Sequence, residues 1–151
     1  MIILAIITVP TITTIFYTAE PPPGKTLELK VIAHQWWWEF EYPDLGITTA
    51  NELHVPVGMA IDVSLESKDV IHSFWVPQLL GKTDAVPGHT NPLEPFVPNE
   101  IGTFAGQCAE FCGSAHALMK FFVHVESLAD FETWVTAMST APEPPEGAAA
   151  D

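Results

Sequence analysis

The run Cys108-Ala-Glu-Phe-Cys112-Gly-Ser-Ala-His116-Ala-Leu-Met119 brings two cysteines, a histidine and a methionine together in one short stretch. A second stretch, Asp69-Val-Ile-His72-Ser-Phe-Trp-Val-Pro77, supplies another histidine. Thiolate and thioether ligands favour Cu(I), whereas imidazole also suits Cu(II), so the mixed set indicates a copper site that transfers electrons. A site with one copper ion needs only one cysteine. Two thiolates can bridge two copper ions, with His72 and His116 as terminal ligands and Met119 as a weak ligand.

A disulfide is the alternative interpretation of the two cysteines. Taken alone, Cys108 and Cys112 in an acidic chain that faces an oxidising compartment would favour it. A disulfide needs neither His116 nor Met119, and it does not account for His72. We therefore prefer the metal site. The remaining histidines stand singly in strand-like or turn-like stretches and are interpreted as structural residues, namely His34, His54, His89 and His124.

The cysteine run resembles the binuclear copper (CuA) loop of cytochrome c oxidase subunit II. The resemblance covers residues from about 27 to 138, in the order of the family. It includes the aromatic segment His34-Gln-Trp-Trp-Trp-Glu-Phe-Glu-Tyr42, the first-histidine stretch 69–77, and the turn 81–88 beside the catalytic subunit. Trp37 stands where the family usually has Tyr, and His89 stands where it usually has Arg.

The resemblance implies a set of metal ligands and an electron-entry residue. Glu110 is implied to give its backbone carbonyl to one copper ion and its carboxylate to a magnesium or manganese ion at the interface with subunit I. A solvated loop charge is the alternative for Glu110. Trp36 matches the exposed tryptophan through which electrons enter from cytochrome c. The implied metal ligands are His72, Cys108, Glu110, Cys112, His116 and Met119.

Alternation along a strand predicts where the aromatic side chains point. Because consecutive residues alternate across a strand, we expect Trp36 and Trp38 to face one side, Trp37 and Glu39 to face the other, and at least one large ring to lie near the surface.

The charge of the chain is strongly negative. Five Lys+Arg against 19 Asp+Glu give a net charge of −14. Nucleic acid is therefore excluded as a partner, since its binding depends on basic residues. An acidic surface favours a basic protein partner through electrostatic steering, and the resemblance implies a c-type cytochrome. Solubility is the plainer explanation of the charge. The carboxylates we consider for docking are Glu39, Glu41, Asp44, Glu52, Glu66 and Asp69.

Composition and periodicity predict an all-β fold. The chain has 14 prolines and 9 glycines between short β-rich runs, and 48% of its residues are hydrophobic, which favours a Greek-key β-sandwich. The resemblance narrows this to a cupredoxin, residues 27–139, with the copper loop joining two strands at one end. Ser127 to Asp130 forms a capping box before a short C-terminal helix. The strands are expected at 27–33, continuing into the tryptophans, and at 53–55, 60–65, 72–76, 102–106 and 121–125.

The two ends of the chain differ from this domain. Residues 1–18 are apolar and uncharged, and we interpret them as a transmembrane helix or its C-terminal part, although a full span needs about 20 residues. They lack the basic region of a signal peptide. Residues 19–26 form a proline-rich linker, and residues 140–151 an acidic tail that we expect to be disordered.

The function implied by the resemblance is that of subunit II of cytochrome c oxidase. This subunit accepts electrons from cytochrome c at the copper centre and passes them to the haem of subunit I, where oxygen is reduced to water with proton pumping. The chain itself carries only electron transfer. Its implied partners are subunit I, other oxidase subunits, cytochrome c and the membrane. We place it in a bacterial inner membrane, rather than a mitochondrial one, with the copper domain on the periplasmic side.

Two other functions involve similar copper chemistry. An isolated copper-binding electron carrier would need neither the tryptophan segment nor a membrane anchor. A nitrous-oxide-reductase-like CuA domain shares the copper loop, but that enzyme also has a large propeller domain, for which this chain is too short.

Overall fold

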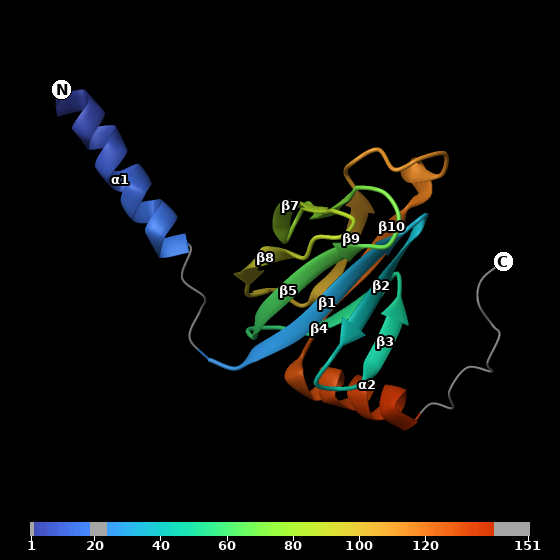
Figure 1. Ribbon diagram of the computed structural model, residues 1–151. Helices are drawn as coiled ribbons and strands as arrows, with labels where there is room; N and C mark the ends of the chain where they lie inside the picture. The colour runs from blue at the N-terminus through green and yellow to red at the C-terminus, as the bar shows by residue number, and fades with distance from the viewer. Residues whose placement is uncertain (1, 19–23, 141–151) are drawn as a thin grey trace.

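The computed structural model describes residues 2–18 and 24–140, which form two β-sheets packed face to face and two helices (Figure 1). The predicted mostly-β sandwich with a helix near each end is confirmed. The first sheet has the order β3 (Ile47–Ala50), β2 (Trp37–Tyr42), β1 (Thr26–His34), β5 (Ala60–Ser67) and β8 (Asn91–Phe96). The second has the order β4 (Glu52–Pro56), β10 (Lys120–Glu126), β9 (Gly102–Cys108), β6 (His72–Val76) and β7 (Leu80–Ala85).

An aromatic cluster fills the core between the sheets. Trp38, Phe74 and Phe121 are at most 1% exposed. The Trp38 ring lies edge-on to both phenylalanines, at 5.4 Å from each, and the two phenylalanines stack at 4.7 Å. Each buried aromatic ring stabilises the fold by about 1.5–3 kcal/mol relative to exposure. The cluster also contacts one of the predicted metal ligands, because the Trp38 ring lies edge-on to His72 of β6 at 6.0 Å.

Gly106 of β9 offers a test of how tightly this core is packed. A Cβ atom at Gly106 would lie 2.1 Å from Cζ of Phe121, whereas one at Gly81 would meet nothing within 4 Å. We expect Gly106→Ala to destabilise the fold by about 3 kcal/mol through overpacking. Gly81→Ala, the matched control, should be neutral or stabilise it by up to about 1 kcal/mol. Urea unfolding measures both, and equal midpoints for the two variants would contradict this packing.

The aromatic segment differs from the prediction. One strand was expected to run from residue 27 through the tryptophans, but the chain reverses at Gln35 and Trp36, and His34 of β1 pairs with Trp37 of β2. Trp36 therefore lies in the turn at 37% exposure, whereas Trp38 is buried. The turn lacks the Gly and Asn residues that usually mark a two-residue hairpin, so the pattern did not reveal it. The prediction that at least one large ring lies near the surface is confirmed.

Three strands were not predicted, namely β3, β7 and β8. Pro92 and Pro95 interrupt the strand pattern of β8, but β8 lies at the edge of its sheet, where proline is tolerated. Two strand pairs are parallel, β1 with β5 and β4 with β10, which differs from the antiparallel pairing of the expected Greek-key sandwich. Parallel pairs join strands that are distant in sequence, which local alternation does not encode.

The C-terminal helix α2 (Leu128–Thr140) begins at the predicted capping box. The Ser127 hydroxyl accepts a hydrogen bond from the Asp130 backbone N–H at 3.2 Å and donates one to its carboxylate at 2.6 Å. Phe131 is buried, and Trp134 packs against Tyr42 at 5.3 Å. In Figure 1, α2 (orange-red) lies at one end of the sandwich, and the orange loop between β9 and β10 lies at the other.

The N-terminal segment forms α1 (Ile2–Thr18), which contains Pro10. In the part of the chain that the structure describes, no helix has the length and apolar character needed to cross a membrane. Residues 19–23 of the predicted linker and 141–151 of the predicted disordered tail lie outside the described residues.

Candidate metal centre

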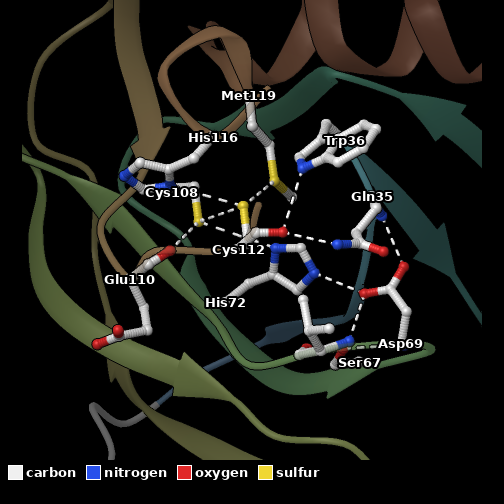
Figure 2. A network of polar contacts seen from close by, with 11 residues as sticks. Gln35, Trp36, Ser67, Asp69, His72, Cys108, Glu110, Cys112, His116 and Met119 are labelled. Atoms are coloured by element: carbon white, nitrogen blue, oxygen red, sulfur yellow. Dashed lines mark hydrogen bonds and ion pairs between the residues drawn. The ribbon is translucent and has the colours of Figure 1, made fainter. Parts of the chain in front are cut away.

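The pairing of β6 with β9 brings the two halves of the site together. Phe74 of β6 pairs with Cys108 of β9, which places His72 next to the cysteine loop. The loop ends are held by backbone hydrogen bonds from Cys108 N to Met119 O at 3.0 Å and from Ala109 N to Ser73 O at 2.9 Å. A single 3-10 turn, η1 (His116–Leu118), then directs His116 and Met119 toward the sulfurs (Figure 2).

The potential ligand atoms form a compact group. The Sγ atoms of Cys108 and Cys112 lie 3.8 Å apart, and neither cysteine is in a disulfide. His72 Nδ1 lies 3.8 Å from Cys108 Sγ, and His116 Nδ1 lies 3.5 Å from Cys112 Sγ. Met119 Sδ lies 3.7 Å from Cys112 Sγ. Each sulfur thus has its own imidazole nitrogen, and Figure 2 shows all five side chains converging.

These distances fit metal coordination. Two sulfurs that share an ion at about 2.3 Å must lie within about 4.6 Å of each other, and a sulfur and an imidazole nitrogen within about 4.4 Å. All the Sγ–Sγ and Nδ1–Sγ separations meet this requirement. His72, Cys108, Cys112 and Met119 are at most 5% exposed, so the sulfurs are shielded from water. The set of soft sulfur and imidazole ligands suits copper.

Glu110 presents two different groups to its surroundings. Its backbone carbonyl accepts a hydrogen bond from Cys108 Sγ at 3.2 Å, whereas its exposed carboxylate accepts one from the Phe111 N–H at 3.1 Å. Figure 2 shows the carboxylate turned away from the two sulfurs. Only the carbonyl therefore lies at the sulfur cluster, and the carboxylate is free to contact another group.

Asp69 orients His72. Its Oδ1 accepts a hydrogen bond from His72 Nε2 at 2.7 Å, so the other ring nitrogen, Nδ1, is the one that faces Cys108 and would bind a metal ion in the neutral ring. Its Oδ2 accepts one from the Gln35 backbone N–H at 2.6 Å. Burial opposes the Asp69 charge, but hydrogen bonds from His72, Val70 and Gln35 outweigh burial and lower the pKa of this carboxyl. One carboxylate therefore links a candidate metal ligand to the aromatic turn.

The aromatic turn also contacts the cysteine loop directly. The Cys112 carbonyl accepts hydrogen bonds from Gln35 Nε2 at 2.7 Å and from Trp36 Nε1 at 3.2 Å. The close approach depends on Gly113, which has a φ of +121° and where a Cβ atom would lie 3.1 Å from both side chains. A half-exposed indole is thereby connected to the backbone of a candidate ligand.

The two thiols differ in acidity because they are so close. Burial opposes the Cys108 thiolate, but hydrogen bonds with His72 and with the Ser73 and Glu110 backbones lower its pKa to about 6. Burial and the neighbouring Cys108 thiolate raise the pKa of Cys112 to about 12. Burial disfavours the His72 cation, but its contacts with Cys108 and Asp69 raise its pKa overall. Without metal, the pair therefore holds one thiolate at neutral pH.

We expect the reduced, copper-free chain to show two separate thiolate titrations by ultraviolet absorbance. Cys108 should ionise near pH 6 and Cys112 only well above its ordinary value of 9.0. Because the Cys108 pKa is depressed, its contribution to stability is complete above pH 9 and is lost as the pH falls through 6. The Cys112 contribution has the opposite sign: it is complete below pH 9 and is lost as the pH rises toward 12. Joint ionisation of both thiols near pH 9 would contradict this assignment.

Most carboxylates considered for docking are paired within the chain. Glu39 contacts His34 at 2.8 Å and Glu52 contacts His124 at 2.5 Å, while Asp69 is bound as described above. Glu41 and Glu66 lie 3.9 and 3.3 Å from Lys30. Docking through these side chains stays a prediction.

Comparison with known proteins places this site in a family. Residues 46–126 match the family described as "Cytochrome C oxidase subunit II, periplasmic domain". The chain belongs to this family. Cytochrome c oxidase subunit 2 of Alkalihalophilus pseudofirmus is 42% identical over 150 residues, which cover 96% of this chain and 44% of the relative. The chain spans less than half the length of the curated relatives it matches, with 44% coverage of this relative and of cytochrome c oxidase subunit 2 of Bacillus sp. (strain PS3).

Solved structures of the family have the same fold. The periplasmic domain of subunit II of cytochrome oxidase (CoxB) of Bradyrhizobium japonicum has a TM-score of 0.73 and 32% identity, with 79% of this chain and 96% of that domain covered. A second structure is a mixed disulfide intermediate between thioredoxin-like TlpA and subunit II of cytochrome c oxidase, with a TM-score of 0.70, 32% identity and coverage of 80% and 94%. The sulfur and imidazole cluster fits a copper site of the type expected in this family.

Two residues of the site were missed or misinterpreted from the sequence. Gln35 was not considered, and Asp69 was considered only for docking. The position of Asp69, three residues before His72, was the available signal that the carboxylate could orient the imidazole.

Proposed function

We propose that this chain accepts single electrons from cytochrome c at a binuclear copper centre, as part of subunit II of a cytochrome c oxidase, and passes them to the haem of subunit I. There, oxygen is reduced to water with proton pumping, so this chain carries electron transfer alone. The observation that carries the proposal is the pair of reduced thiols 3.8 Å apart, each with an imidazole Nδ1 beside its sulfur.

The ligands divide between the two ions by their neighbours. His72 lies beside Cys108 and His116 beside Cys112, so each would be the terminal ligand of one copper ion, with both sulfurs bridging. Met119 and the Glu110 carbonyl would complete the set as weak ligands. When bound, copper would supply one-electron redox chemistry.

The protein's part is to hold these ligands rigidly and to connect them to the surface. Strand pairing and the loop-end hydrogen bonds fix the cysteines, and the buried aromatic cluster excludes water. Trp36 offers a partly exposed π system whose Nε1 donates to the Cys112 carbonyl, and we assign electron entry to this residue. The acidic surface would steer a basic donor to it at low salt.

Membership of the family also suggests the complex in which this chain works. Subunit I, other oxidase subunits and a membrane are its partners, in a bacterial inner membrane with the copper domain on the periplasmic side. The Glu110 carboxylate points away from the sulfurs, which supports a magnesium or manganese ion at the interface with subunit I. The TlpA mixed disulfide of a related subunit II supports a thioredoxin-like protein as a reductant for the cysteine pair before copper enters.

The first test is the copper content and electron paramagnetic resonance spectrum of the oxidised chain. We expect two copper ions per chain and a seven-line hyperfine pattern from one unpaired electron shared by both nuclei. One copper with a four-line pattern would overturn the proposal in favour of an isolated blue-copper carrier. No copper, with Cys108 bonded to Cys112, would return the site to a disulfide. Failure of the copper-loaded chain to accept electrons from reduced cytochrome c would overturn the electron-entry role.

A further inference from the structure

A second group of imidazoles and carboxylates lies at some distance along the same sheet from the cysteine loop. His54 of β4 and His124 of β10 are register partners in a parallel pair, and their rings stack at 4.6 Å. Trp134 of α2 stacks on His54 at 4.5 Å. Leu53 and Val123, the residues before each histidine, are buried in the core, so both histidines lie on the outer face of the sheet.

Each histidine is paired with a carboxylate from the opposite strand. His54 Nδ1 lies 3.1 Å from Glu126 Oε1, and His124 Nε2 lies 2.5 Å from Glu52 Oε2. Glu52 and Glu126 are each two residues from the histidine on their own strand, so all four side chains share one face. We name His54, His124, Glu52 and Glu126 the outer-face cluster.

One carboxylate oxygen of the outer-face cluster has no partner. Glu126 Oε2 is buried and accepts no hydrogen bond from any described residue. Leaving a buried acceptor unsatisfied is unfavourable, and the penalty is larger for a charged group. A cation bound beside this oxygen would remove the penalty. The net charge of −14 for the whole chain also favours cation binding.

We propose that the outer-face cluster is a second metal site, separate from the copper centre, that binds one divalent transition-metal ion such as Zn²⁺. Imidazole with carboxylate is a ligand set for zinc and its neighbours, whereas calcium and magnesium prefer oxygen ligands alone. Two ligands on one tetrahedral zinc ion lie about 3.3 Å apart, which is close to the His54–Glu126 separation of 3.1 Å. The remaining ligands would come from His124 and Glu52.

The pairing of β4 with β10 determines which parts of the outer-face cluster must move when a metal ion binds. The backbones of β4 and β10 are held in register by their ladder, so the movement would have to come from the side chains. Aiming both rings at one ion would separate the stacked imidazoles and break the contact of His124 Nδ1 with Thr103 Oγ1 at 3.1 Å. Among the described residues, only His72, Cys108 and Cys112 already have their ligand atoms within 4.8 Å of one another. Because the outer-face cluster is not assembled in advance, we expect affinity in the micromolar range, on the order of 1–10 μM.

The test is isothermal titration of the full chain with ZnCl₂, in a C108S/C112S background that removes the thiolates of the copper centre. We expect one Zn²⁺ per chain, together with a rise in the thermal unfolding midpoint. His124→Gln and His54→Gln should each weaken binding by at least about tenfold and remove the thermal shift. This outcome does not depend on whether copper binds at Cys108 and Cys112.

His34→Gln is the matched control. His34 also contacts a glutamate, Glu39, at 2.8 Å and stacks on a tryptophan, Trp37, at 4.3 Å, but it has no second histidine beside it. Its loss should leave Zn²⁺ binding unchanged. If His54→Gln unfolds because the Trp134 stack is lost, His124→Gln decides the question. Absence of binding, or binding that survives both substitutions as adventitious surface contact, would overturn the proposal.

Discussion

Cys108→Ser is expected to convert the proposed binuclear copper centre into a site for a single copper ion. Serine keeps the shape of the side chain but replaces the soft bridging sulfur with a hard hydroxyl oxygen, which is a poor ligand for Cu(I). Cys112 keeps His116 Nδ1 at 3.5 Å and Met119 Sδ at 3.7 Å, and His72 stays nearby. One cysteine, two histidines and a methionine form the ligand set of a blue-copper site. Copper analysis should fall from two ions to one, and the seven-line spectrum should become four-line.

Ser114→Ala is the control for this variant. Ser114 is exposed in the same loop, and its side chain makes no hydrogen bond with any residue that the structure describes, so its substitution should leave both ions and the spectrum unchanged. Two copper ions with an unaltered seven-line spectrum in Cys108→Ser would show that Cys108 is not a bridge. Circular dichroism confirms that loss of copper is not loss of the fold.

The copper loop could be predicted because its chemistry is local in sequence. Cys108, Cys112, His116 and Met119 lie in one run, and a few residues of loop with one 3-10 turn suffice to bring them together. The capping box of α2 was predictable for the same reason, since Ser127 and Asp130 are three residues apart. Structural features that depend only on residues close together in the sequence can therefore be predicted from the sequence.

Features decided by contacts between distant segments could not be read in this way. The hairpin at Gln35 and Trp36 is closed by hydrogen bonds to Asp69 and to the Cys112 carbonyl, which lie far along the chain. The parallel pairing of β4 with β10 stacks His54 on His124. The alternation of apolar and polar residues along each strand does not predict this pairing. The sequence therefore predicted single structural histidines where the fold creates a cluster.

Asp69→Asn is expected to weaken copper binding by about 10–100-fold, which is the usual cost of losing the partner that orients a metal-bound histidine. The carboxylate accepts hydrogen bonds from His72 Nε2 through Oδ1 and from the Gln35 N–H through Oδ2. An asparagine has only one acceptor oxygen, so its NH₂ group must face either Gln35 or His72. The imidazole then loses the charge that favours Nδ1 as its metal-binding nitrogen. Competition with a Cu(I) chelator measures the affinity.

The same substitution should also slow electron acceptance from reduced cytochrome c, because Asp69 holds the turn that carries Trp36. Stopped-flow measurement on fully copper-loaded protein separates this effect from the loss of copper. Asp62→Asn removes an equal charge from an exposed position of β5 and controls for weaker electrostatic steering. If both variants slow the reaction equally at low salt and neither does at high salt, Asp69 acts only through its charge. If Asp69→Asn alone stays slow at high salt, where surface charges are screened, the loss lies in the contacts that join the Trp36 turn to His72.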